Sequence, residues 1–183
     1  MRLDHIAYRT NDRLKSSKFF IDAFGYRIQD EFEIKFQDGS CAKCIALEPP
    51  EKCLDNGDWS MYQTVGSLDK GIIRQEYHLP PEIFVSDGDK DSIVGKWVKD
   101  RGGIGGVHHM AYQVESVQDT MVEWKSKGYA EFTSDSPLVC PGLVQVFTKP
   151  SELTGIIYEF IERDGQGFCS SNVEKLMEST KGL

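Results

Sequence analysis

One short phrase occurs twice in this chain and constrains its fold more than any other feature. Residues 5–8 read HIAY, and residues 109–112 read HMAY. Each phrase stands in a strand-like run, and the helix-like run that follows ends on Gly-Tyr, at 25–26 and at 128–129. Such self-similarity predicts two copies of one supersecondary unit. It also gives each copy a histidine in the same place, which a pseudo-twofold axis would bring together.

Both halves of the chain are interpreted as βαβββ units. Short runs rich in strand formers and bounded by turn residues indicate strands. In the first half they lie at 3–8, 26–36, 41–47 and 82–86, and in the second half at 107–114, 143–148 and 155–161. Helices are expected before Gly25 and at 91–100, 116–127 and 170–179.

The first helix is predicted from its start signal and from its apolar spacing. Asn11 and Asp12 can accept hydrogen bonds from the free amide groups of a first helical turn. Leu14, Phe20 and Phe24 form an apolar stripe, which is expected to pack on the core.

The composition is that of an ordinary globular protein. The chain has 183 residues, of which 39% are hydrophobic and 27% charged, and a net charge of −8 with a pI of about 5.0. This acidic balance disfavours nucleic acid and anionic membranes as partners. No apolar run approaches the roughly 18 residues of a spanning helix. The N-terminus leads straight into a strand, so we expect no signal peptide, no membrane partner and a cytoplasmic location.

The cysteines give no sign of a site of their own. They number five and are scattered, at positions 41, 44, 53, 140 and 169. An odd and sparse set favours free thiols in a reducing compartment. The CxxC at 41–44 falls on a predicted strand, where its two side chains point to opposite faces, and no second CxxC completes a zinc site.

Residues 48–79 form the least regular stretch of the sequence. A long irregular segment in a compact domain is often a lid or a binding loop. His78 lies in this segment and is a weak candidate for a metal ligand.

The sequence resembles the vicinal oxygen chelate superfamily at residues 4–8, 106–112 and 157–160. That group includes glyoxalase I, methylmalonyl-CoA epimerase, extradiol dioxygenases and 4-hydroxyphenylpyruvate dioxygenase. The resemblance implies an α+β fold in which paired βαβββ modules form a half-open, barrel-like sheet around a divalent metal. The single domain, 1–183, would comprise module one at 1–88, a connecting helix and turn at 89–106, module two at 107–163 and a C-terminal lid helix at 164–183.

The resemblance also implies a ligand set, because ligands in this superfamily lie on the first and last strands of each module. By position these are His5 and Glu82 in module one, and His109 and Glu159 in module two. Imidazole and carboxylate together suit Fe(II), Zn, Co, Ni or Mn. Two histidines with one carboxylate are typical of non-haem Fe(II) oxygenases, whereas a second carboxylate leaves two open positions on the metal.

Each candidate ligand has a plainer interpretation. A histidine on an apolar strand is often a hydrogen-bonded core residue, and Glu82 follows two prolines, where an edge position on the surface is equally compatible. Glu159 stands in an apolar run, so its buried charge requires a partner, which a metal would provide. His108 is expected to point to the opposite face of the strand from His109.

The C-terminal third resembles the end of 4-hydroxyphenylpyruvate dioxygenase, at 143–150, 157–163 and 167–172. The resemblance implies that Gln145, Phe168 and Asn172 bind substrate and that the terminal helix gates the pocket. That enzyme has an additional N-terminal module pair, and it usually has a glutamine where this chain has His108. Residues 92–97 and 106–111 are closer to the epimerase, but the position of the epimerase's basic glutamate falls at about Cys44.

Three functions follow from these observations, all with a small-molecule substrate and with a homodimer as a possible assembly. The first is an Fe(II) dioxygenase that acts on a small 2-oxo acid or a related compound. The second is a lyase or isomerase of the glyoxalase and epimerase kind, in which Glu159 or Glu82 moves a proton and a raised carboxylate pKa is needed. The third is a non-catalytic, metal-dependent binding protein. A ligand role for Glu82 would favour the second function over the first.

Overall fold

A computed structural model describes residues 1–49, 63–65, 74–76, 80–164 and 168–183. Most of the irregular segment at 48–79, including His78, therefore lies outside the described residues.

The strands and helices follow the expected order and add short strands that the sequence pattern does not reveal. The strands are β1 (Arg2–Arg9), β2 (Arg27–Lys35), β3 (Cys41–Glu48), β4 (Gln63–Val65), β5 (Arg74–Glu76), β6 (Glu82–Gly88), β7 (Gly106–Gln113), β8 (Leu138–Cys140), β9 (Leu143–Phe147) and β10 (Ile157–Arg163). The helices are α1 (Arg13–Phe24), α3 (Ile93–Asp100), α4 (Val117–Ser126) and α5 (Ser170–Ser179). The unexpected strands are β4, β5 and β8, each of three residues.

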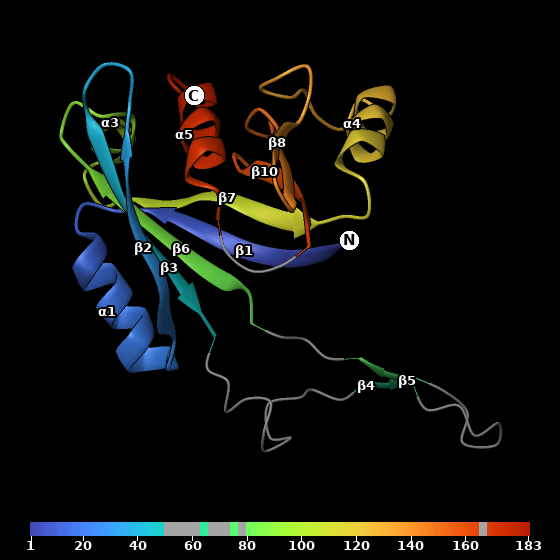
Figure 1. Ribbon diagram of the computed structural model, residues 1–183, viewed down its shortest axis with the longest axis horizontal. Helices are drawn as coiled ribbons and strands as arrows, with labels where there is room; N and C mark the ends of the chain where they lie inside the picture. Colours follow the sequence, from blue (N-terminus) through green and yellow to red (C-terminus); the bar gives the residue numbers. More distant parts are fainter. Residues whose placement is uncertain (50–62, 66–73, 77–79, 165–167) are drawn as a thin grey trace.

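The main sheet shows the internal repeat directly. Its eight strands run in the order β2-β3-β6-β1-β7-β10-β9-β8, and β4 pairs with β5 in a separate sheet. From the centre of the sheet outward, the four strands of each module follow the same order: first, last, third and second. These are β1, β6, β3 and β2 in module one, and β7, β10, β9 and β8 in module two. Strands β1 and β7 are antiparallel neighbours at the centre (Figure 1). The α+β fold with a half-open, barrel-like sheet that the family resemblance implies is thus confirmed.

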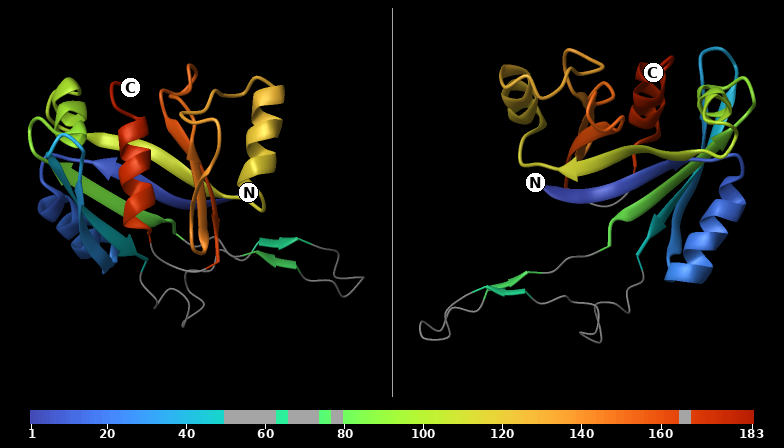
Figure 2. Two further views of the ribbon diagram at one scale, coloured as in Figure 1. Left: turned by 45° about the horizontal axis from the view of Figure 1, so that its top comes forward. Right: turned by 180° about the vertical axis from the view of Figure 1, so that it is seen from behind.

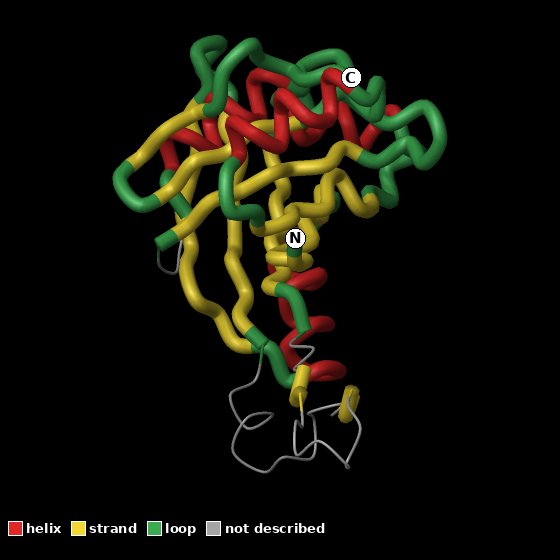
Figure 3. Tube along the Cα trace, turned by 90° about the vertical axis from the view of Figure 1, so that its right-hand side faces the viewer, coloured by secondary structure: helices red, strands yellow, loops and turns green. Residues whose placement is uncertain are grey.

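Helix α5 lies inside the curve of this sheet, whereas α1 packs on the outside of module one (Figures 2 and 3). Helix α5 contacts β2 in the first module and β8 and β9 in the second. Val173 and Met177 of this helix join the same buried cluster as Ala7 and Phe84 of the two inner strands. The terminal helix therefore forms part of the core on the concave side.

Helix α1 has the expected ends but not the expected buried face. Asp12 caps its start by accepting a hydrogen bond from the Lys15 amide, and Gly25 ends it with φ 75°. Its one buried residue is Ser17, while Leu14 and Phe24 are more than half exposed. The predicted stripe is therefore only partly buried: Phe20 packs against a buried cluster, whereas Leu14 and Phe24 stay exposed.

Among the described residues, no helix has both the length and the apolar character needed to cross a bilayer.

Two glycines in the turn before β7 offer a matched test of backbone packing. Gly102 and Gly105 have φ values of 74° and 83°, which strain any L-residue. A Cβ at Gly102 would meet nothing within 4 Å, but at Gly105 it would lie 2.2 Å from the Arg9 carbonyl oxygen. We expect Gly102→Ala to lower the free energy of unfolding by about 1 kcal/mol and Gly105→Ala by about 3 kcal/mol. Urea denaturation measures both; equal losses would contradict this close approach.

Candidate metal centre

Three buried side chains from three adjacent strands converge on one point. They are His5 of β1, His109 of β7 and Glu159 of β10. The His5 Nε2 and His109 Nε2 atoms are 3.2 Å apart. Glu159 Oε2 lies 3.3 Å from His5 Nε2 and 3.1 Å from His109 Nε2. The structure therefore brings together one candidate ligand from the first module and two from the second.

The triangle of these atoms has the size that one metal ion requires. Ligand atoms about 2.1 Å from an ion are about 3.0 Å apart on an octahedral face and about 3.4 Å apart in a tetrahedron. The observed edges of 3.1 to 3.3 Å lie between these values. Two imidazoles and a carboxylate also match the donors that divalent transition metals prefer. The donor set therefore fits such an ion, without selecting which one.

Each of the three side chains is held in place through its other polar atom. Asp4 Oδ1 lies 2.8 Å from His5 Nδ1, and Gln145 Nε2 donates to Glu159 Oε1 at 2.6 Å. The Nδ1 atoms of His108 and His109 are 2.8 Å apart. Partners of this kind fix the orientation of metal ligands and leave the opposite atoms free to bind.

The electrostatics keep the carboxylate of this cluster ionised. Burial acts to raise the pKa of Glu159, but hydrogen bonds from His109 and His5 outweigh it and hold that pKa well below the usual range. Burial also acts to lower the pKa of His5, but Asp4 and Glu159 outweigh it and raise it to about 9. Burial lowers the pKa of His109 despite the opposing effect of Glu159. Glu159 is therefore suited to coordination and poorly suited to taking up a proton.

His108 does not point away from the cluster as expected from strand alternation. Between β1 and β7, Ala7 pairs with His109 and Tyr8 pairs with Val107, so that His108 is an extra residue in a β-bulge. The bulge breaks the alternation and lets His108 line the same pocket as His109. A bulge depends on the pairing of strands distant in sequence, and the chain alone gives no signal for it.

Glu82 is not part of the convergent cluster, and the pairing registers explain why. In module two, Glu159 pairs with Ala111, two residues beyond His109. The matching residue in module one is Ala7, two beyond His5, and it pairs with Phe84. The structural counterpart of Glu159 is therefore Phe84. Glu82 lies two residues before it on β6 and so does not occupy the position at which a fourth ligand was expected.

Glu82 instead lies beside Arg163, with Oε2 3.5 Å from Nη1. Arg163 also donates to Asp4 at 2.7 Å. Burial raises the pKa of Glu82, and the charge of Arg163 partly offsets this. Glu82 does not line the pocket around the cluster, so a role in moving a proton there has no support from its position.

The cluster opens onto a pocket with mostly apolar walls. The cavity has a volume of about 30 Å³, which is room for an ion and a few water molecules, so a larger ligand would require the residues that cover it to move. Its lining includes Phe84, Phe147 and Phe168, and α5 contributes Val173 and other apolar residues. The Phe168 ring meets the His5 ring edge-on, with centroids 5.1 Å apart. Helix α5 and Phe168 therefore cover the candidate metal centre.

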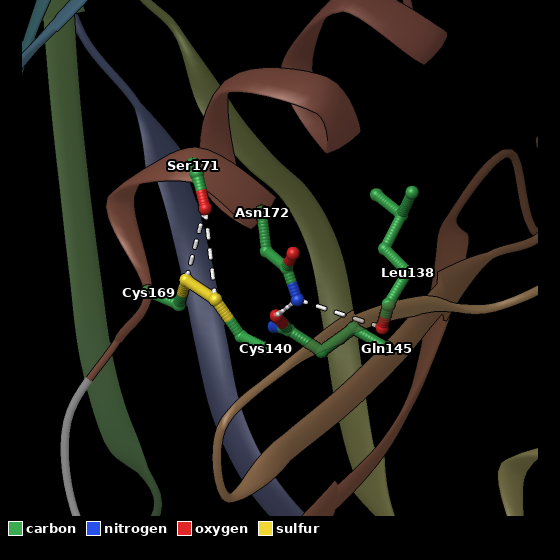
Figure 4. Close-up of a disulfide and its surroundings, with 6 residues drawn as sticks. All are labelled: Leu138, Cys140, Gln145, Cys169, Ser171 and Asn172. Carbon is green, nitrogen blue, oxygen red and sulfur yellow. Dashed lines mark hydrogen bonds between the residues drawn. A yellow bond between two sulfur atoms is a disulfide. The ribbon is translucent and has the colours of Figure 1, made fainter.

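A chain of amides connects α5 to the cluster. Asn172 Nδ2 donates to Gln145 Oε1 at 3.2 Å (Figure 4). Gln145 in turn donates to Glu159. Gln145 lines the pocket, whereas Asn172 does not. Of the residues expected to bind substrate, Gln145 and Phe168 thus face the pocket, and Asn172 lies behind Gln145.

A disulfide joins Cys140, the last residue of β8, to Cys169, the N-cap residue of α5 (Figure 4). The Ser171 hydroxyl lies near both sulfur atoms. This bond corrects the expectation that all the cysteines are free thiols. Since the two residues are 29 positions apart, only the folded arrangement reveals the pair.

Comparisons with known proteins support the fold. A variant of 4-hydroxymandelate synthase from Streptomyces coelicolor has a TM-score of 0.72 and 17% identity over 98% of this chain. The chain spans 53% of that enzyme's length. Methylmalonyl-CoA epimerase from Mycobacterium tuberculosis has a TM-score of 0.59 and 17% identity, over 90% of this chain and 89% of its own.

An epimerase variant from Streptomyces coelicolor, in complex with 2-nitronate-propionyl-CoA, also has a TM-score of 0.59, with 18% identity over 90% of this chain and 99% of its own. At such identities the likeness shows the fold alone, which this chain shares with these enzymes. No protein-family model matches the sequence, and no curated protein matches it.

The ligand assignment predicts how substitutions change metal content. His109→Ala should abolish stoichiometric binding of Fe(II) or Zn(II), because it removes one of the three donors that converge among the described residues. His108→Ala should weaken the metal affinity by roughly 10- to 100-fold, as loss of an orienting partner does. Glu82→Gln is the control and should bind metal like the wild type. Metal analysis after dialysis measures all three; loss of metal from Glu82→Gln would return Glu82 to the ligand set.

The disulfide predicts a thiol count and a stability change. Cys140 and Cys169 form the bridge, so the denatured protein should titrate at least two fewer thiols before reduction than the five expected after it. Closing a loop of 29 positions stabilises by about 3 to 4 kcal/mol on the chain-entropy model. Cys169→Ser should lose about that much free energy of unfolding, whereas Cys41→Ser should lose little. Five titratable thiols in unreduced protein would contradict the pairing.

Proposed function

We propose that this protein is a metal-dependent dioxygenase that acts on a small 2-oxo acid, with Fe(II) held by His5, His109 and Glu159. The proposal rests on the residue that module one presents at the structural counterpart of Glu159, where a fourth metal ligand would stand. Phe84 stands where a symmetrical site would have a second carboxylate. Its ring cannot coordinate, so the described residues supply three donors and leave the rest of the coordination sphere open.

Fe(II) held by His5, His109 and Glu159 would supply the redox chemistry that couples a 2-oxo acid to dioxygen. The chain's own residues would do the rest. Glu159 stays ionised and fixed by Gln145. Phe84 and Phe147 line the pocket with apolar rings, and the Phe168 ring packs edge-on against the His5 ring. Excluding water in this way protects a reactive site from side reactions.

An epimerase or lyase is the second candidate, favoured by the likeness to epimerases that this chain matches along nearly their whole length. Such chemistry needs a side chain poised to take up a proton at the substrate. Among the described residues that line the pocket, Glu159 is the one carboxylate, and its pKa is held low. The thiol of Cys44 is no substitute, because burial raises its pKa to about 12.

Oxygen uptake tests the proposal. Protein loaded with Fe(II) under nitrogen should consume oxygen only when a 2-oxo acid is added, and Zn-loaded protein should consume none. In parallel, the exchange of deuterium from heavy water into the carbon next to a thioester or ketone tests the second candidate. Deuterium exchange with no oxygen uptake across a panel of 2-oxo acids would overturn the dioxygenase proposal.

The Phe84 position gives a sharper variant of this test. Phe84→Glu places a carboxylate in register with Glu159 of the other module, so we expect the metal to be retained and oxygen uptake to fall to the level of metal-free protein. Phe84→Leu keeps the position apolar and should retain most of the uptake. Full activity in Phe84→Glu would mean that this position does not face the open side of the metal.

A further inference from the structure

A buried arginine lines the same pocket as the candidate metal centre. Arg9 is on β1, four residues after His5, and the alternation of the strand places both on the concave face. At about 3.3 Å per residue, their Cα atoms are about 13 Å apart. The Arg9 side chain is part of the pocket lining and only 2% exposed. It therefore marks one end of the pocket, and the convergent cluster marks the other.

The Arg9 guanidinium has no carboxylate partner within the part of the chain that the structure describes, although its Cζ lies over the Trp97 ring, 5.7 Å from the ring centroid. No carboxylate there lies within ion-pair distance. Its Nη2 donates to the Thr180 hydroxyl at 3.1 Å, and its Nη1 is buried without a hydrogen-bond partner. Burial lowers the pKa of Arg9 to about 9, and the charge of Arg101 acts in the same direction. A buried cation among neutral and like-charged groups is costly unless an anion joins it.

A second unpartnered polar atom lines the pocket. His108 Nε2 is buried and has no hydrogen-bond partner among the described residues. If His109 presents the lone pair of Nε2 to an ion, its proton is on Nδ1, and His108 Nδ1 must accept it across the 2.8 Å contact. The proton of neutral His108 is then on Nε2. Arg9 and His108 thus both offer free donors to the pocket.

We propose that Arg9 binds a second acidic group of the substrate, so that the site selects a 2-oxo acid with a carboxylate at the end remote from the metal. This inference rests on the proposed function and adds the substrate class to it. The apolar walls at Phe84 and Phe147 suit the uncharged middle of such a molecule. A divalent ion with Glu159 leaves one positive charge, and Arg9 adds another, which together match a dianion.

A purely structural role for Arg9 is the competing explanation. Thr180 is the C-cap residue of α5, and a cation near a helix C-terminus is favourable. This contact uses one of the five N–H donors of the guanidinium. If anchoring α5 were its whole role, Arg9 variants would change stability and would leave the preference between acidic and neutral substrates unchanged.

The test compares two 2-oxo acids that differ at the remote end. Protein loaded with Fe(II) under nitrogen is titrated calorimetrically with 2-oxoadipate and with 2-oxohexanoate. We expect the wild type to bind the dicarboxylate roughly 10- to 100-fold more tightly, as a charge-assisted hydrogen-bonded pair allows. Arg9→Met should abolish this ratio, and Arg9→Lys should keep part of it. Thr180→Val removes only the contact to α5 and should leave the ratio intact.

The outcomes separate this inference from the proposed function. A wild-type ratio near one, or an unchanged ratio in Arg9→Met, overturns the role of Arg9 even if oxygen uptake is found. A high ratio that Arg9→Met removes supports it even if no oxygen is consumed. If Arg9→Met fails to fold, Arg9→Lys and Thr180→Val decide the question. A preference for the dicarboxylate that falls as far in Thr180→Val as in Arg9→Lys would assign Arg9 to the anchoring of α5 alone. Where the wild type prefers the dicarboxylate, the same titration with 4-carboxyphenylpyruvate and 4-methylphenylpyruvate shows whether the preference also holds for aromatic 2-oxo acids.

Discussion

The antiparallel pairing of β1 with β7 is the interaction on which the rest of the structure depends. It joins the two modules and sets Ala7 opposite His109 and His5 opposite Ala111. Because strand side chains alternate, a slip of one residue would turn one histidine to the outer face. The parallel pairing of β10 with β7 then adds Glu159 in register. The candidate metal centre is thus built by the backbone ladder of three strands before any metal binds.

The two modules share a backbone plan but contribute unequally to the site. Module two supplies two of the three convergent side chains, along with Gln145, and the helix that follows it covers the pocket. Module one supplies His5 and presents Phe84 where a fourth donor would stand. This asymmetry leaves one side of the site open and apolar, and Arg9 gives that pocket a positive far end. The proposed dioxygenase chemistry depends on this difference between the modules, with Phe84 in module one at the position of Glu159 in module two.

The repeat made the paired modules and the meeting of His5 with His109 predictable, and the family resemblance added the barrel-like sheet and Glu159. The rest depends on pairings between distant segments. Counting along the sequence placed a ligand at Glu82, but only the register between β1 and β6 reveals Phe84. The bulge that turns His108 into the pocket belongs to the β1–β7 ladder. The disulfide likewise has no local signal.

The number of positions left open on the metal tests the central claim most directly. Nitric oxide binds Fe(II) where dioxygen would, and its complex has a characteristic high-spin EPR signal. With three protein donors, anaerobic Fe(II) protein should bind a 2-oxo acid and nitric oxide together, and the acid should change the signal without removing it. If saturation with the 2-oxo acid excludes nitric oxide, the protein supplies more than three donors and the account given for Phe84 is wrong.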